Sequence, residues 1–251
     1  MEELLELKEN ERIDDLEYKG LKIIQNKDGF CFGVDSILLS DYAKGIKKGS
    51  TVVDIGTGTG IVAILLCAKT NLKKIYGIEL QEEVANIAQR NVELNGLDDK
   101  MEVININIKD VFSKLEKNKI DVIVTNPPYK KHDTGVKNLD TRQLISRHEV
   151  ECTLEDIIKN ASLLLKDLGE FYMVHRAERI VDIFVTLRKY KLEPKNIRFV
   201  HSKIGEKPNL VLVKAVKCAK EFLMIDKPFV IYGEEGNYTD EIYEIYDKKR
   251  K

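Results

Sequence analysis

The chain has 251 residues, of which 43% are hydrophobic and 33% charged, and its formal net charge is -1. This balance fits a soluble globular chain with a core of useful size. The N-terminal segment is acidic where a signal peptide is basic, and no apolar run approaches the ~20 residues that cross a bilayer. We therefore expect a cytoplasmic protein without a membrane partner.

The cysteine pattern indicates reduced thiols. The four cysteines, Cys31, Cys67, Cys152 and Cys218, lie far apart and form no CxxC pair. Such spacing does not favour a disulfide framework or a zinc site. His148 lies four residues before Cys152, but two residues do not make a structural metal site. We expect no metal.

Residues 1–50 predict an N-terminal extension. The runs 21–25 and 29–32 are separated by Asn26-Lys27-Asp28 and are typical of a short hairpin. A helix should follow, with Asp35 or Ser36 near its cap. We expect this extension and a core of residues 51–251 to form a single domain over residues 1–251.

Short apolar runs and helix-like stretches alternate from residue 51 onward. The runs suited to strands buried on both faces are 51–55, 74–79, 101–105, 121–126 and 170–175. The helix-like stretches that follow them are 60–70, 82–95, 109–117, 153–166 and 176–190. This alternation predicts an α/β fold with a mostly parallel sheet, helices on both faces, and ligands beyond the carboxyl ends of the strands.

The last third of the chain has a different pattern. The runs 196–202 and 209–217 are joined by the turn sequence GEKP, which predicts a closing antiparallel hairpin. With this hairpin, the expected sheet has seven strands. A run at 229–232 and an amphipathic final segment complete the chain.

A glycine-rich turn, DIGTGTG at residues 54–60, follows the first parallel strand. Glycines at this point let the backbone turn tightly and approach a ligand. A GxGxxG dinucleotide fingerprint starting at Gly56 needs glycine at position 61, where Ile61 stands. Asp54 would repel a pyrophosphate but attract an ammonium group. The candidate cofactor residues here are Asp54, Gly56, Thr57, Gly58 and Gly60.

Two further acids lie at successive strand ends. Glu79, followed by Leu80, ends the second strand, where a carboxylate can accept both ribose hydroxyls of an adenosine. Asp110, followed by Val111, lies past the third strand, where it can accept from an adenine amino group. Taken singly, each acid is explained as well by a role as a helix cap or surface charge as by a role in cofactor binding. Together with the glycine-rich turn, the set resembles the S-adenosylmethionine (SAM) site of class I methyltransferases over residues 51–125.

The sequence NPPY follows the fourth strand, beside the expected cofactor. Prolines and asparagine also suit a simple turn, but the position favours chemistry. An exocyclic amine on a heteroaromatic ring is a poor nucleophile, because its lone pair is delocalised. If the Asn126 side-chain oxygen and the Pro127 carbonyl accept the two amine hydrogens, the lone pair turns toward the methyl group. Pro128 stiffens the loop, and Tyr129 offers a face on which a base stacks. Because NPPY lies beside the expected cofactor, Asn126 is also a candidate cofactor-binding residue.

NPPY resembles the motif of amino methyltransferases acting on adenine, guanine or glutamine amide. The surrounding segments FCFGVDSILL (30–39), RHE (147–149) and EPK (193–195) resemble the bacterial tRNA1(Val) adenine-N6 methyltransferase family. YG (232–233) through YT (238–239) adds to this likeness. The resemblance spans nearly the whole chain and implies a class I Rossmann-like fold, SAM as cofactor and a tRNA adenine as substrate. A release-factor glutamine methyltransferase and a non-catalytic RNA-binding module remain alternatives.

The resemblance also implies where ligands lie. It places Phe32 and Asp35 over the methionine end of SAM. Residues 188–220 contain ten Lys or Arg against two acids and favour a polyanion partner. The loop after NPPY is also basic, and we expect it to be a lid that meets RNA. The candidate RNA-binding residues are Lys130, Lys131, Arg142, Arg147, His148, Lys203 and Lys207.

Overall fold

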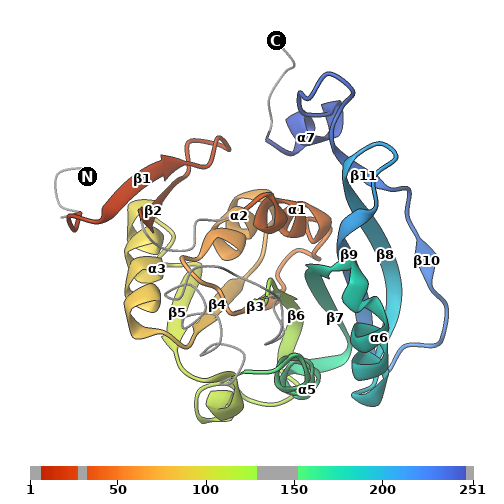
Figure 1. Cartoon of the computed structure of the whole chain (residues 1–251). Coiled ribbons are helices and arrows are strands. Elements are labelled where there is room, and N and C mark those ends of the chain that lie inside the picture. The colour runs from red at the N-terminus through yellow and green to blue at the C-terminus, as the bar shows by residue number, and fades with distance from the viewer. Residues whose placement is uncertain (1–6, 28–32, 129–151, 247–251) are drawn as a thin grey trace, which may run out of the picture.

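A computed structural model describes residues 7–27, 33–128 and 152–246. Within them, the main sheet has nine strands in the order β10-β8-β9-β7-β6-β3-β4-β5, with β11 also paired to β8 (Figure 1). Seven strands form its body: β3 (Thr51–Ile55), β4 (Lys74–Glu79), β5 (Met101–Asn105), β6 (Ile120–Thr125), β7 (Leu165–Arg176), β8 (Leu192–Lys203) and β9 (Pro208–Lys217). Two short strands, β10 (Met224–Ile225) and β11 (Phe229–Tyr232), extend the sheet beyond the seven expected.

The body of the sheet is parallel except for one strand. β3 is parallel to β4 and β6, β4 to β5, and β6 to β7. β9 is antiparallel to both β7 and β8, which confirms the predicted closing hairpin. The carboxyl ends of β3, β4, β5 and β6 therefore meet at one edge of the sheet, which we call the carboxyl edge. The opposite edge, where these strands begin, is the amino edge.

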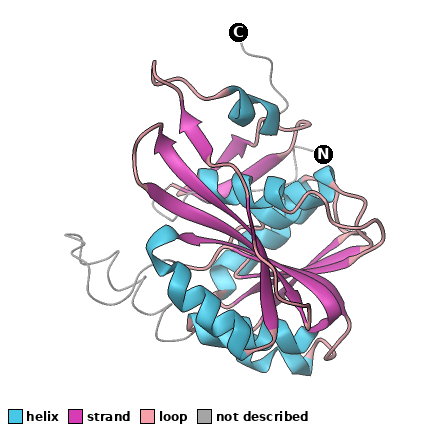
Figure 2. Ribbon diagram, turned by 90° about the vertical axis from the view of Figure 1, so that its right-hand side faces the viewer, coloured by secondary structure: helices cyan, strands magenta, loops and turns pink. Residues whose placement is uncertain are grey.

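Helices cover both faces of the twisted sheet (Figure 2). One face is covered by α1 (Val34–Tyr42), α2 (Ile61–Lys69) and the C-terminal α7 (Asp240–Ile245). The other is covered by α5 (Leu154–Leu164) and α6 (Ile180–Lys189). The sheet therefore has two cores, the first under α1, α2 and α7 and the second under α5 and α6. Successive strand residues point to opposite faces, so Val52 packs in the first core and Val53 in the second. This explains why the central strands are apolar at nearly every position.

The N-terminal extension contains a strand that the sequence did not indicate. β2 (Lys22–Asn26) pairs in antiparallel register with β1 (Glu11–Asp15), while the partner predicted at 29–32 lies outside the described residues. β1 carries no apolar stripe, because Ile13 is 41% exposed and its buried residue is a glutamate, Glu11. Both oxygens of that carboxylate accept hydrogen bonds from Arg90 Nη1, at 2.8 and 2.9 Å. Arg90 lies on α3 (Glu82–Leu94), so the hairpin is anchored to this helix.

Three of the expected helices differ from the structure or gain detail in it. The helix predicted at 109–117 is wrong, because the structure has only a short 3-10 helix, η2 (Ile108–Ser113), whose first turn is capped by the Asn107 side chain. α1 begins with Gly33 as its N-cap, so Asp35 lies inside the first turn. At α5, a reciprocal capping box between Thr153 and Asp156 sets the start of the helix.

Candidate active site

Side chains from three neighbouring strands converge at the carboxyl edge. The strand registers pair Ile55 with Ile78 on one side and with Thr125 on the other. Asp54, Glu79 and Asn126 therefore lie at adjacent strand ends, as the alternation of strands and helices predicts. Each of them comes from a different part of the chain.

Asp54 is a buried carboxyl group with one close polar partner on the neighbouring loop. Its side chain is 1% exposed, and Thr57 Oγ1 donates a hydrogen bond to Asp54 Oδ2 at 2.7 Å. Burial raises the pKa of Asp54 to about 7, and repulsion from Glu79 adds to the rise, whereas the Thr57 bond lowers it. A cation beside this carboxyl group would favour its charged form.

Glu79 links the glycine-rich loop to the end of β4. Its Oε2 accepts a hydrogen bond from the Gly58 backbone N–H at 3.0 Å, and its Oε1 accepts one from the Gln81 N–H at 2.9 Å. A carboxylate has about four acceptor positions, of which these two bonds use two. The remaining positions suit a pair of hydroxyl donors.

The glycine-rich loop has a backbone that other residues rarely adopt. Gly56, Gly58 and Gly60 have φ values of 71°, 58° and 91°. A Cβ added at Gly56 or Gly58 would meet no atom within 4 Å, so the loop is open on that side. Its other side is packed tightly, because a Cβ on Gly77 of β4 would lie 2.9 Å from Thr57 Cγ2. Gly77 was not among the predicted site residues, although a glycine inside an apolar strand is a signal of close backbone approach.

The remaining cofactor candidates on β4 and η2 differ in exposure. Leu80 is half-buried, Asp110 is exposed at the start of η2, and Val111 is fully buried in the second core. The Val111 side chain therefore packs inside the protein rather than at its surface. Asn105, which was also not predicted, donates from Nδ2 to the Glu79 and Leu80 carbonyls at 2.9 and 3.0 Å. A polar residue at the end of β5 was the available signal.

Asn126 is held by a residue of α1. Its Nδ2 donates to Ser36 Oγ at 3.0 Å, and Ser36 is 3% exposed. This bond engages the amide nitrogen, which fixes the plane of the group that carries the acceptor, Oδ1. Asp35 Oδ1 accepts from the Ser36 backbone N–H at 3.0 Å. Ser36 thus forms hydrogen bonds with both Asp35 and Asn126. The sequence indicated Ser36 only as a residue near a helix cap.

The prolines continue this arrangement. Pro127 is buried and Pro128 is exposed, and neither belongs to a strand. Thr125, the last residue of β6, donates from Oγ1 to the Ile55 carbonyl at 2.8 Å and ties the end of β6 to β3. Seven of the predicted site residues lie outside the described residues: Phe32, Tyr129, Lys130, Lys131, Arg142, Arg147 and His148.

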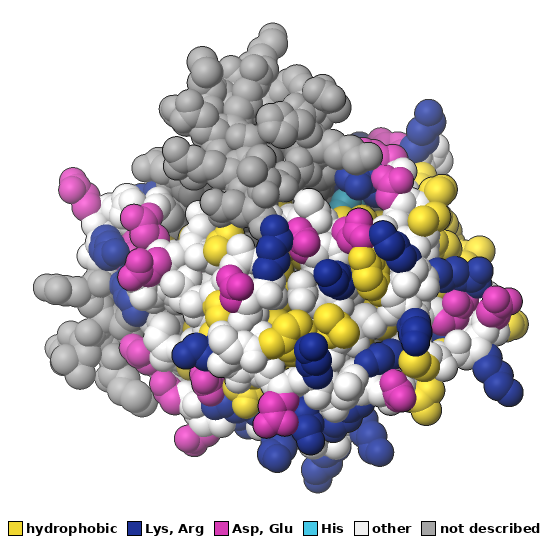
Figure 3. Space-filling model, turned by 90° about the horizontal axis from the view of Figure 1, so that it is seen from below, with side chains coloured by type: hydrophobic (Ala, Val, Ile, Leu, Met, Phe, Trp, Pro, Cys, Tyr) yellow, Lys and Arg dark blue, Asp and Glu magenta, His cyan; other side chains and the backbone are white. Residues whose placement is uncertain are grey.

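The basic stretch 188–220 is divided by the fold. Lys203 and Lys207 are exposed beside the turn between β8 and β9, and because β8 runs in the same direction as β7, this turn lies on the side of the carboxyl edge. Lys217 lies at the far end of β9, where its Nζ donates to Asn118 Oδ1 at 2.7 Å and to the Leu165 carbonyl at 2.8 Å. Arg198 is paired with Glu241 at 2.7 Å. Figure 3 shows basic and acidic side chains interspersed on the face seen from below.

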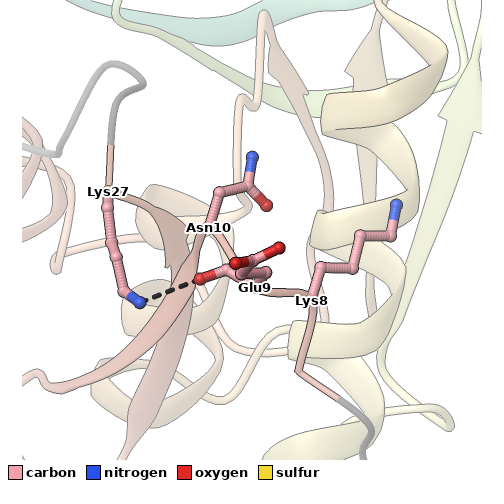
Figure 4. A pocket seen from close by; sticks show the side chains of 4 residues that line it. All are labelled: Lys8, Glu9, Asn10 and Lys27. Carbon is pink, nitrogen blue, oxygen red and sulfur yellow. Dashed lines mark hydrogen bonds between the residues drawn. The ribbon is translucent and has the colours of Figure 1, made fainter.

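The described residues show no further ligand site of a recognised type. A hollow of about 570 Å³ at the open end of the N-terminal hairpin is lined by Lys8, Glu9, Asn10 and Lys27 (Figure 4), none of which is a predicted site residue. In the ranges 7–27, 33–128 and 152–246, no group of three or more His, Cys, Asp or Glu is placed to hold a metal ion. None of the helices in these ranges is long and apolar enough to span a membrane.

Comparison with solved structures defines the class of this fold. A "predicted O-methyltransferase" from Agrobacterium tumefaciens superposes with a TM-score of 0.68 at 19% identity, covering 85% of this chain and 95% of the other. TYW2 of M. jannaschii, solved in complex with AdoMet, gives a TM-score of 0.58 at 18% identity, covering 84% and 88%. The chain has the class I methyltransferase fold.

Sequence comparison then defines the family. Residues 33–189 match the model of the methyltransferase small domain, and the chain belongs to this family. It is 28% identical over 237 residues to a tRNA1(Val) (adenine(37)-N6)-methyltransferase from Bacteroides thetaiotaomicron, which covers 92% of this chain and 98% of that protein. A protein of the same name from Phocaeicola vulgatus is 25% identical over 222 residues, covering 87% and 92%.

Proposed function

We propose that this protein is a SAM-dependent methyltransferase that methylates N6 of an adenine in tRNA, the adenosine next to the anticodon of a valine tRNA. The observation that carries the proposal is the position of Asn126 and Pro127, which follow β6 directly and lie beside the buried acids of the carboxyl edge. The names of the relatives support adenine in tRNA as the substrate. We also propose a cytoplasmic location, which a tRNA substrate supports.

The residues of the carboxyl edge fit SAM by their chemistry. Asp54 is a buried carboxyl group suited to the ammonium of the methionine moiety, and Glu79 retains acceptor positions for the two ribose hydroxyls. Asp110 is exposed past β5, where it can accept from the adenine amino group. Asp35, with Phe32, would lie over the methionine end. When bound, SAM supplies a methyl group made electrophilic by its sulfonium.

Asn126 and Pro127 would activate the amine. Asn126 Oδ1 and the Pro127 carbonyl each accept one hydrogen of the adenine NH2 group, which draws the nitrogen toward tetrahedral geometry and directs its lone pair outward. The Ser36 bond to Asn126 Nδ2 supports this role, because it holds the amide with its oxygen on the opposite side. The nitrogen becomes acidic once it is alkylated, so its proton leaves to water and no strong base is required.

Rigid positioning would supply most of the acceleration. Holding the two reacting atoms ~3 Å apart and in line can contribute about 7 to 11 kcal/mol. The Thr125 bond to β3 and the two prolines make the end of β6 stiff enough for this. Tyr129 would stack on the extruded base, an interaction worth roughly 1 to 3 kcal/mol. These residues would hold the base while the cofactor residues hold SAM.

The RNA backbone would be bound by basic residues around this edge. Lys203 and Lys207 are exposed beside the β8–β9 turn. We assign the same role to the basic residues after Tyr129: Lys130, Lys131, Arg142, Arg147 and His148. Lysine and arginine contacts to phosphates make binding dependent on salt.

Incubation with methyl-labelled SAM and separate pools of tRNA, DNA and release factor tests the proposal. We expect label in tRNA, recovered after digestion as N6-methyladenosine. Label in the release factor alone would show a glutamine methyltransferase instead. SAM binding without any turnover would show a non-catalytic RNA-binding module.

A further inference from the structure

One buried side chain on α3 joins the N-terminal hairpin to the glycine-rich loop. Asn91 is 0% exposed. Its Nδ2 donates to the Thr59 carbonyl at 2.9 Å and to the Ile24 carbonyl at 3.1 Å, and its Oδ1 accepts from the Ile24 N–H at 2.6 Å. Thr59 belongs to the loop after β3, and Ile24 belongs to β2. The amide thereby satisfies three backbone groups from two segments that are distant in sequence.

Asn95, the C-cap residue of α3, makes the hairpin contact without the loop contact. Its Oδ1 accepts from the Lys22 N–H at 3.0 Å, and its Nδ2 donates to the Lys22 carbonyl at 2.8 Å. Within the described residues, its other side-chain bond goes to the Asn91 carbonyl. The two asparagines, one helical turn apart, thus continue the hydrogen-bond ladder of β2 on the edge that faces α3. Only Asn91 extends this ladder to the cofactor loop.

The glycine-rich loop requires such an external tie. Its three glycines adopt left-handed conformations, and glycine loses more conformational freedom on ordering than any other residue. Thr57 and Glu79 hold the loop from the side of β3 and β4. Asn91 holds it from α3, at the peptide that leads into Gly60 and α2. The hairpin end of this tie is itself anchored, because Glu11 of β1 pairs with Arg90, the neighbour of Asn91.

We propose that Asn91 is a positioning residue for SAM binding, and that the N-terminal hairpin acts through it as a brace for the cofactor loop. The proposal rests on SAM being the cofactor but not on the identity of the methyl acceptor. It assigns part of the cofactor affinity to a segment, residues 7–27, that lies before the methyltransferase core.

Comparison of Asn91→Ala with Asn95→Ala tests this role, since both remove an anchor of β2 and only the first removes the tie to the loop. SAM affinity is measured by titration calorimetry on the full chain, and stability by thermal denaturation without ligand. We expect Asn91→Ala to weaken SAM binding by roughly tenfold, because it removes a buried hydrogen bond and leaves a carbonyl unsatisfied. Asn95→Ala should lower stability but keep the affinity within about twofold. Equal losses of affinity in the two variants, or wild-type affinity in Asn91→Ala, would overturn the proposal.

A second measurement covers the case in which Asn91→Ala does not fold. Asn91→Ser keeps a small polar group, and hydrogen exchange of the amides at 56–60 reports directly on the loop in the absence of SAM. We expect faster exchange there in Asn91→Ser than in the wild type or Asn95→Ala, and unchanged exchange would refute the brace. If the wild type itself does not bind SAM, the proposed function fails, while the exchange rates still decide whether Asn91 positions the loop.

Discussion

The charged side chains at the two edges of the sheet differ in their exposure to water. At the carboxyl edge, Asp54 and Glu79 are buried and are satisfied by loop and backbone donors. At the amino edge, lysines form exposed ion pairs between neighbouring strands, such as Lys166 with Asp121 at 2.7 Å and Lys74 with Glu102 at 3.5 Å. Exposed pairs are worth about 0 to 1 kcal/mol each, because water screens them. A buried acid, in contrast, is costly to charge unless hydrogen-bond donors or a cation lie beside it.

This difference shows how one scaffold separates stability from function. Removing one of these exposed lysines at the amino edge alters a contact that water can replace. Removing an acid at the carboxyl edge alters a buried group whose hydrogen bonds water cannot replace. Substitutions at the carboxyl edge should therefore change binding or catalysis by large factors, and those at the amino edge should not.

The largest expected effect is that of Asn126→Ala. This change removes one of the two acceptors proposed for the amine, so we expect the rate of methyl transfer to fall by about two orders of magnitude or more. SAM affinity should stay nearly unchanged, because the lost interaction acts on the methyl acceptor. Single-turnover kinetics with tRNA measures the rate, and calorimetry measures the affinity. A fully active variant would refute the role of Asn126.

Asp54→Asn should have the next largest effect. It removes the negative charge proposed to bind the SAM ammonium, so we expect the affinity to fall by about ten- to a hundredfold at pH 8. Calorimetry checks this, with Asp110→Asn as a control at an exposed site that should lose less. Wild-type affinity in Asp54→Asn would place the ammonium elsewhere.

The raised pKa of Asp54 predicts that the stability of the protein depends on pH. Burial raises the pKa of Asp54 to about 7 from 3.8, so the folded protein without ligand binds a proton that the unfolded chain releases at lower pH. The resulting stability is complete below about pH 4 and is lost as the pH rises through about 7. Because this pKa lies near 7, we expect the free energy of unfolding to fall less between about pH 5 and about pH 8 in Asp54→Asn than in the wild type. Denaturant unfolding at several pH values measures this, and identical profiles would contradict it.

A smaller effect is expected at the β8–β9 turn. Replacing Lys203 and Lys207 with alanine should weaken tRNA binding by several-fold, and each lost phosphate contact should lower the slope of log K against log salt by roughly 0.7 to 0.9. SAM affinity should not change. Filter binding at several salt concentrations checks this. The double variant Lys74→Ala with Lys166→Ala, at the amino edge, is the matched control, and equal losses in both would remove the turn from the RNA surface.

The smallest effect is expected for Lys166→Ala alone. It breaks the exposed pair with Asp121, so the free energy of unfolding should change by no more than about 1 kcal/mol, and methyl transfer should be unchanged. Denaturant unfolding and an activity assay measure both. A large loss of activity would show that the two edges are coupled more closely than their separation in the sheet implies.

Several elements were predictable because their signals are local. The strands β3, β4 and β5 have the bounds expected from their apolar runs, since burial on both faces demands apolar residues in succession. The strand β1 was not predictable, because its one buried residue is an acid whose partner, Arg90, is far away in the sequence. The helix expected at 109–117 was wrong because a few buried apolar residues fit a 3-10 turn as well as an α-helix.

The sequence by itself determined the alternation of apolar strands and helices from residue 51 onward, except at η2, together with the glycine-rich turn and the acids at the strand ends. Each of these is encoded within a few adjacent residues. Only the tertiary structure decided that Ser36 holds Asn126, that Asn91 ties Thr59 to Ile24, and that residues 188–220 are divided between places far apart. These facts depend on hydrogen bonds between residues up to 90 positions apart and on the direction in which each strand crosses the sheet. No local pattern records either of them.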